Sequence, residues 1–173
     1  MGDFKMGNNT VLTQSGTAKP TFGSGVPTGM IIQATHGSVT GDVYSATTSW
    51  TSSPLKAASN ITFTPKFATS NILLIANFQA YTAATYGYYD FYKNASDVAE
   101  TYNLSGLVFG LTMIDVATSW EGKMMTFLDP VAENSTTEKT YSISARGHTA
   151  SNTYIGYSAA NSNQLITIME IAG

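Results

Sequence analysis

The segment at the carboxyl end of the chain, residues 164–172, places the strongest constraint on the fold. Its sequence, Gln-Leu-Ile-Thr-Ile-Met-Glu-Ile-Ala, predicts one β-strand with apolar side chains on both faces. The two predicted faces are Leu165, Met169 and Ile171 on one side, and Ile166 and Ile168 on the other. A strand that is apolar on both sides must be covered on both sides, by a second sheet, by another subunit or by both. The segment therefore indicates a rigid structural assembly, and its apolar residues are candidates for core or subunit packing.

Further strands are predicted wherever apolar residues alternate between clusters of Gly, Ser, Asn and Pro. The predicted strands are residues 30–36, 61–64, 71–81, 86–92, 107–114, 123–128, 138–146, 152–157 and 164–171. Many short strands at regular spacing are typical of two packed sheets. The sequence therefore predicts an all-β fold, an antiparallel β-sandwich of jelly-roll-like type.

Several of these segments carry more detailed expectations. In residues 71–81, Ile72, Leu74, Ala76, Phe78 and Ala80 share one face. Residues 86–92 are expected to pair with that strand as a hairpin across residues 82–85. In residues 138–146, Tyr141, Ile143 and Ala145 are expected to face inward, and Thr140, Ser142, Ser144 and Arg146 outward. Residues 97–102 are predicted to form one helical turn capped by Ser96.

The first 28 residues differ in composition from the rest of the chain. They are rich in Gly, Thr, Ser and Lys and contain few apolar groups, so they are not expected to fold alone. Two interpretations stay open for this segment: disorder, or an anchoring arm that becomes ordered on a partner. The predicted organisation is an extended N-terminal arm over residues 1–28 and one sandwich domain over residues 29–173.

The composition excludes several classes of function. Charged residues make up 11% of the chain, against roughly 25% in ordinary globular proteins, which suits burial between subunits or contact with neutral ligands such as glycans. The net charge is −3 and the eight Lys and Arg form no basic stripe, so no nucleic-acid partner is expected. The absence of cysteine excludes disulfides, thiolate zinc sites and cysteine nucleophiles. No apolar run reaches membrane-spanning length, and no apolar stretch typical of a secretory signal opens the chain. We therefore expect no membrane insertion, and synthesis in a cytoplasm.

No residue pattern indicates catalysis, a metal or a cofactor. Four carboxylates lie near predicted strand ends, where an acid pair for glycoside hydrolysis could converge: Asp90, Asp115, Glu121 and Asp129. The favoured interpretation is that they are turn residues, as the Asp129-Pro130 dipeptide suggests. His36 and His148 lie far apart and lack metal-ligand spacing. We expect neither an enzyme, nor a metal site, nor a cofactor.

The most distinctive chemical feature is a stretch rich in tyrosine. Its candidate residues for glycan binding or packing are Tyr81, Tyr86, Tyr88, Tyr89 and Tyr92. Tyrosine combines a flat apolar face with a hydroxyl, which suits both stacking on sugars and anchoring of protein contacts. Because alternate residues of a strand point to opposite faces, at least one set is expected in a core, and packing is favoured over glycan binding.

Three segments in order resemble a family of small virion proteins of tailed bacteriophages, of the tail-fibre-like, head-fibre and capsid decoration type. The segments are Ile-Thr-Phe-Thr-Pro with Ala-Thr-Ser-Asn-Ile-Leu-Leu-Ile (61–65 and 68–75), Phe-Leu-Asp-Pro with Lys-Thr-Tyr-Ser-Ile (127–130 and 139–143), and the terminal strand (165–172). The resemblance covers roughly residues 29–173. It implies a β-sandwich head that forms a homotrimer on the virion surface and is joined to the particle by its amino-terminal part. It does not imply catalysis.

The resemblance also sets the expected partners and location. Many relatives carry long fibre shafts, whereas only 28 residues precede the domain here, which favours a short capsid-surface protein over a tail fibre. We expect a trimeric capsid decoration or head-fibre protein on the virion surface. Its expected partners are two copies of itself and, through residues 1–28, the major capsid protein or another virion protein. The alternative is a tail-fibre tip that binds a host surface glycan. For the trimeric capsid-surface protein, Ile168→Asp is expected to prevent trimer formation, as measured by light scattering.

Overall fold

The protein is built from β-strands alone. The computed structural model describes residues 2–15, 17–18, 21–23, 25–39, 43–45, 48–50, 55–56, 60–115, 119–130, 135–156 and 164–173. Within these residues every regular element is a strand and all paired strands are antiparallel. The predicted all-β class is confirmed. None of the described residues belongs to a helix long and apolar enough to span a membrane.

One layer of the sandwich, here called the β8 sheet, is centred on the strand β8 (Asn71–Thr82). One edge of β8 pairs along its length with β12 (Glu121–Pro130). Its other edge pairs first with β15 (Gln164–Ile171) and then with β14 (Thr153–Ile155). The outermost strands are β4 (Ile31–Val39), which pairs with β15, and β5 (Val43–Ser45), which pairs with β14.

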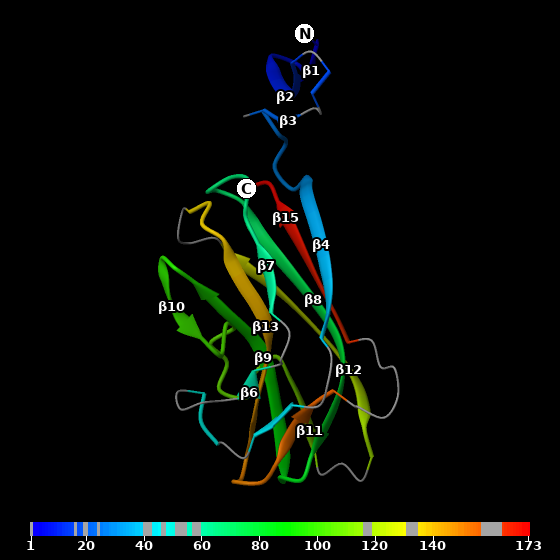
Figure 1. Cartoon of the computed structure of the whole chain (residues 1–173), viewed down its shortest axis with the longest axis vertical. Helices are drawn as coiled ribbons and strands as arrows, with labels where there is room; N and C mark the ends of the chain where they lie inside the picture. Colours follow the sequence, from blue (N-terminus) through cyan, green and yellow to red (C-terminus); the bar gives the residue numbers. More distant parts are fainter. Residues whose placement is uncertain are drawn as a thin grey trace.

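The second layer, here called the β9 sheet, is centred on β9 (Tyr86–Ala95) and β13 (Lys139–Gly147), which pair over nine positions from Lys139↔Ala95 to Gly147↔Gly87. The edge of β9 that faces away from β13 pairs with β10 (Val98–Thr101) and β11 (Thr112–Asp115). The edge of β13 that faces away from β9 pairs with β6 (Leu55–Lys56) and β7 (Ile61–Phe63). Figure 1 shows the two layers running along the long axis of the molecule.

The order of the strands among the described residues is that of a jelly roll. At four places in the sheets, two strands lie one after the other and together occupy the place of one long strand. These pairs are β4 with β5, β6 with β7, β10 with β11, and β14 with β15. With β8, β9, β12 and β13 they make eight positions, four in each sheet. Followed along the chain, successive strand positions alternate between the β8 sheet and the β9 sheet. The exception is β10, which follows β9 within the β9 sheet. This is the double Greek key of a jelly roll, so the predicted sandwich is confirmed.

The predicted hairpin between residues 71–81 and 86–92 is wrong. Strands β8 and β9 lie in different sheets, and the connection between them crosses from one layer to the other. Its backbone is held instead by Ala83, whose N–H donates to Asn152 O at 2.8 Å, and by Ala84, whose N–H donates to Thr82 Oγ1 at 3.0 Å. A connection of this length can join two strands within one sheet or two strands on opposite sides of a core. Because both edges of β8 are already paired with other strands, β9 lies in the opposite sheet.

The predicted helical turn at residues 97–102 is also wrong, because β10 forms there as a second strand beside β9. The predicted strand 107–114 is reduced to β11, since Gly106 and Gly110 adopt left-handed backbone conformations, with φ of 71° and 67°. The residues between β10 and β11 cover the outer face of the β9 sheet. For this reason Ser142 and Ser144, predicted to face outward, lie on that outer face but are fully buried.

The core lies between the two sheets and matches the predicted inward faces. The alternate residues of β8 from Ile72 to Ala80 are buried, as are Tyr141, Ile143 and Ala145 of β13. Ile166 and Ile168 of β15 join them at 0% exposure. Burial of each large aliphatic side chain stabilises the fold by roughly 1.5–3 kcal/mol.

The described part of the predicted arm contains a small sheet of its own. Strands β1 (Gly2–Met6), β2 (Asn9–Gln14) and β3 (Thr21–Phe22) form an antiparallel meander, where the sequence predicts an extended segment. Short polar strands of this kind give little apolar periodicity for sequence analysis to detect. Figure 1 shows this sheet beyond the end of the sandwich at which β4 begins and β15 ends.

Both ends of the domain are fastened at that same end of the sandwich. Gly29 N–H donates to Ala172 O at 2.7 Å, and Ala172 N–H donates to Met30 O at 2.9 Å. The fully buried Glu170 carboxylate accepts from Lys66 N–H at 2.8 Å, Phe67 N–H at 2.9 Å and Gln33 Nε2 at 2.7 Å. These bonds fix the position from which the N-terminal sheet projects.

Candidate functional site

The outer face of the β8 sheet is the first candidate for function. Residues that stand opposite one another in adjacent antiparallel strands share a face, so the register defines this surface. Its side chains on β12, β8, β15 and β4, here called the neutral face, are Met124, Thr126, Leu128, Asn71, Leu73, Ile75, Asn77, Leu165, Thr167, Met169, Ile171, Ile31, Ala34, His36 and Ser38. None of these described side chains is Asp, Glu, Lys or Arg. Met124 and Leu128 are 66% and 49% exposed.

The neutral face contains three of the five candidate residues of the terminal strand. Leu165, Met169 and Ile171 lie on it and are partly buried. Ile166 and Ile168 point the other way, into the core. The expected Ile168→Asp test therefore does not address subunit contact, because a carboxylate at a fully buried position would disrupt folding itself.

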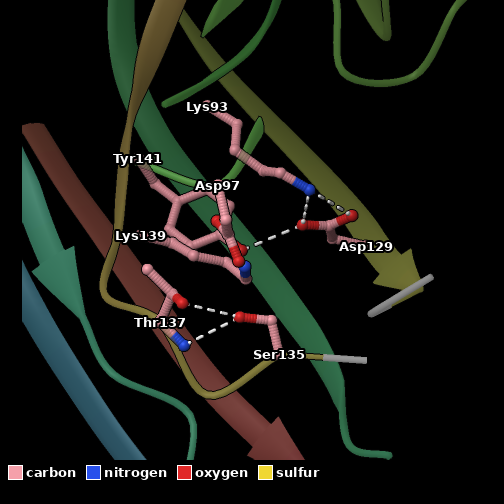
Figure 2. Close-up of polar contacts among 7 residues, drawn as sticks. All are labelled: Lys93, Asp97, Asp129, Ser135, Thr137, Lys139 and Tyr141. Carbon is pink, nitrogen blue, oxygen red and sulfur yellow. Dashed lines mark hydrogen bonds and ion pairs between the residues drawn. The ribbon is translucent and has the colours of Figure 1, made fainter. Parts of the chain in front are cut away.

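A cluster of charged and hydroxyl side chains from β9, β12 and β13 is drawn in Figure 2. Lys93 of β9 points across the sandwich toward Asp129 of β12, with Nζ 3.1 Å from Oδ2. The Tyr141 hydroxyl donates to the same Oδ2 at 2.9 Å. All three side chains are buried, so Asp129 is not the exposed turn residue that the sequence predicts. The cluster joins the two sheets by paired charges.

The second part of the cluster involves Lys139, which is fully buried and has Nζ 4.0 Å from Asp97 Oδ1. Hydrogen bonds from the Ser135 and Thr137 hydroxyls, together with the Lys139 charge, hold the pKa of Asp97 below its usual value. Ser135 and Thr137 are themselves linked, with Thr137 N–H donating to Ser135 Oγ at 3.0 Å (Figure 2). This network fastens the segment that precedes β13.

The four carboxylates considered for acid catalysis do not form one group among the described residues. Glu121 and Asp129 stand at opposite ends of β12. Asp115 is exposed on β11. Asp90 lies on the outer face of β9 beneath residues 102–110, where it accepts from Phe91 N–H at 2.7 Å and Ser105 N–H at 3.1 Å. Its burial raises the pKa of Asp90 above the usual value for an aspartate.

The two histidines lie on different sheets. His36 is exposed on the neutral face, and His148 follows β13, with Nδ1 3.1 Å from the Tyr88 hydroxyl. Among the residues that the structure describes, no three of His, Asp or Glu are grouped as they would be around a metal ion.

The five candidate tyrosines are divided among three environments. Tyr89 belongs to the core, where its hydroxyl donates to Tyr81 O at 3.1 Å and Tyr154 O at 3.2 Å, and burial raises its pKa far above the usual range. Tyr81 lies on the other side of the β8 sheet, with its ring centroid 5.5 Å from that of Trp120 and 5.4 Å from that of Tyr154. The remaining three lie on the outer face of the β9 sheet.

On that outer face, Tyr86 and Tyr88 belong to an aromatic group built around Arg146. The Arg146 guanidinium carbon is 4.5 Å from the centroid of the Tyr88 ring and 5.3 Å from that of Trp50. Its Nη2 donates to Val108 O at 2.6 Å, and burial lowers the pKa of Arg146. The sequence correctly places Arg146 outward on β13. It does not indicate that the residues between β10 and β11 cover it.

Tyr92 lies further along the same face and is nearly fully buried. Its ring centroid is 5.0 Å from that of Tyr102, and its hydroxyl donates to Glu100 Oε1. Burial, and then the neighbouring Glu100 carboxylate, raise the pKa values of Tyr92 and Tyr102.

Beside Tyr92 there is an open depression of about 540 Å³, lined by Trp50, Glu100, Thr101, Tyr102 and Asn103. The sequence analysis singles out none of these residues as a site. An isolated tryptophan and a Glu-Thr-Tyr-Asn run indicate a binding site only when the two segments are known to lie on the same face.

In comparisons with known proteins, no family and no curated protein matches this chain.

Proposed function

We propose that this chain is a structural protein of the surface of a tailed-bacteriophage virion, a homotrimeric capsid decoration or head-fibre protein attached through residues 1–28. The observation that carries this proposal is the neutral face. An antiparallel sheet that meets water on one side ordinarily alternates apolar and polar residues. The outer side of the β8 sheet instead carries Leu73, Ile75, Leu165 and Met169 at its centre and no Asp, Glu, Lys or Arg among its described side chains.

A second copy of the chain is the occupant that suits this face. Large contiguous apolar patches on soluble proteins mark contact surfaces, and contacts between like subunits are the more apolar ones. Around a threefold axis the three neutral faces can converge side by side, and faces without charged residues do so without like-charge repulsion. Three copies arranged around an axis would also project three N-terminal sheets in one direction, and the linked contacts would strengthen attachment to a regular shell.

The position of the N-terminal sheet supports the proposed attachment through it. It projects beyond the end of the sandwich at which both Gly29 and Ala172 are fastened. Phe4 and Met6 of β1 are 56% and 53% exposed, and β1 pairs with β2 alone in the described residues. An exposed edge strand with apolar side chains is suited to pairing with an extended segment of another protein.

The association is tested with two matched methionines. Met124→Asp places a charge on the neutral face, and Met113→Asp places the same charge on β11 of the opposite sheet, where Met113 is 53% exposed. We expect a trimer mass by light scattering for the unaltered protein and for Met113→Asp, and a monomer mass for Met124→Asp. Both positions are exposed enough for the monomer to fold. A trimer of Met124→Asp as stable to dilution as the unaltered one would contradict the proposal.

Imaging of the intact particle tests the attachment. We expect density for residues 1–28 on major capsid subunits, with the sandwich directed outward. Density for this segment on a tail component would overturn the capsid assignment and favour the tail-fibre alternative.

A further inference from the structure

We infer that the depression lined by Trp50, Glu100, Thr101, Tyr102 and Asn103 binds a neutral glycan. This binding activity goes beyond the structural role proposed above. The depression lies on the outer face of the β9 sheet, away from the neutral face, so trimer formation through the neutral face leaves it open. Its volume of about 540 Å³ falls within the range of small-molecule sites.

Two aromatic rings supply the apolar surface of the site, and both are held in place. Trp50 Nε1 donates to Val108 O at 3.2 Å, and Arg146 lies against the ring. Tyr102 packs on Tyr92, whose hydroxyl is itself bonded to Glu100. The C–H face of a pyranose ring packs well on such surfaces, and fixed rings lower the entropic cost of binding.

The polar groups of the depression suit hydroxyl-rich ligands. The Glu100 carboxylate already accepts hydrogen bonds from the hydroxyls of both Tyr92 and Tyr102. A carboxylate has about four lone-pair sites, so it can accept further hydrogen bonds from sugar hydroxyls. The Thr101 hydroxyl donates to Ala99 O at 3.2 Å and can still accept.

The charge of the lining decides the class of glycan. Its described lining residues include one carboxylate and neither Lys nor Arg, in a chain whose net charge is −3. Phosphorylated, sulfated and uronic-acid ligands would therefore be repelled. A basic peptide is the competing occupant. It is less favoured because the described lining offers a single carboxylate as counter-ion, whereas it presents two aromatic rings that are held in place.

The test uses the indole N–H signals of the two tryptophans in the unaltered protein. The probes are neutral trisaccharides of glucose, galactose, mannose and N-acetylglucosamine, with a galacturonic acid trisaccharide and a Lys-rich peptide for comparison. We expect at least one neutral trisaccharide to shift the Trp50 signal and the amides of residues 100–103 saturably, with a Kd of about 1 mM. The Trp120 signal on the other sheet should stay in place.

Substitution of each tryptophan provides the matched control. We expect Trp50→Ala to weaken binding at least tenfold and Trp120→Ala to leave it unchanged, both measured by calorimetry. If Trp50→Ala fails to fold, the shift map of the unaltered protein decides the question alone. The inference is overturned if none of the neutral trisaccharides shifts the Trp50 signal at about 50 mM, roughly fifty times the expected Kd. It is also overturned if only the Lys-rich peptide or the galacturonic acid probe does so.

Discussion

At the scale of single residues, the interior charges of this chain hold its two sheets together at one end. Lys93 and Asp129 come from opposite sheets, are both nearly fully buried and meet at 3.1 Å. The Tyr141 hydroxyl, from the same sheet as Lys93, completes the hydrogen bonding of the carboxylate. Desolvation offsets much of the attraction within such a pair, but the removal of one partner leaves a buried charge uncompensated.

A double-mutant cycle measures this pair. Lys93→Met alone is expected to lower the free energy of unfolding by about 3–5 kcal/mol, because Asp129 then stays buried without its cation. Lys93→Met combined with Asp129→Leu is expected to be distinctly more stable than Lys93→Met alone. Urea unfolding at fixed protein concentration provides the measurement. Losses that simply add in the double variant would show that the two charges do not interact.

Asp90 and Asp97 predict opposite dependences of stability on pH. Burial raises the pKa of Asp90 in the folded state, so its contribution to stability is full below the unfolded pKa, near 3.9, and is lost as pH rises through the folded value. Hydrogen bonds lower the pKa of Asp97, so its contribution is present above the unfolded pKa and is lost as pH falls through the folded value.

Melting temperatures between pH 3 and pH 7 test both signs. Asp90→Asn should gain stability relative to the unaltered protein as pH rises, since the amide oxygen of the new side chain can still accept from the N–H groups of Phe91 and Ser105. Asp97→Asn should lose stability relative to the unaltered protein over the same rise. Parallel pH profiles for the two variants would refute the assignment of one raised and one lowered pKa.

At the scale of elements, the segment between β10 and β11 shapes the outer face of the β9 sheet. It covers Asp90, Ser144 and Arg146, and the carbonyl of its Val108 accepts from both Trp50 and Arg146. Gly110 allows the close approach to β9, because its φ is 67° and a Cβ there would collide with the carbonyl oxygen of Tyr89. Gly110 therefore allows the segment to reach the position from which the Val108 carbonyl holds Trp50.

Substitution of Gly110 tests the role of this segment. We expect Gly110→Ala to destabilise the fold by about 1–3 kcal/mol through backbone strain and steric overlap. It should also increase hydrogen exchange at residues 103–111. Gly122→Ala is the matched control, because a Cβ at this exposed position of β12 would approach only Gln79 Nε2, at 3.8 Å. Equal effects of the two substitutions would show that the close approach at Gly110 is unimportant.

At the scale of the whole molecule, two outer faces of one jelly roll differ in chemistry. The β8 sheet presents the neutral face, which suits a second copy of the chain. The β9 sheet carries a covered, hydrogen-bonded surface with an aromatic depression at its side. The N-terminal sheet projects from one end of the sandwich, where Glu170 fastens the terminal strand to residues 66 and 67. The proposed association, ligand contact and attachment would therefore use separate surfaces.

Most of the strands, and the inward faces of β8, β13 and β15, could be predicted from the sequence. Alternation of apolar residues reports which side of a strand is buried, since that periodicity follows from backbone geometry alone. The predicted hairpin of residues 71–81 with 86–92 failed because periodicity does not report which strand forms the hydrogen bonds. The turn at residues 97–102 failed for a related reason, since pairing with β9 overrode its local preference.

The sequence by itself determined an all-β sandwich with a doubly apolar terminal strand, because these properties depend on residues close together in the chain. Only the tertiary structure decided that Ile166 and Ile168 fill the core, whereas Leu165, Met169 and Ile171 join an uncharged outer face. It also decided that Trp50 meets residues 100–103, about fifty positions away. Contacts of this kind are set by strand order and register, which arise from the packing of the whole chain and not from any one segment.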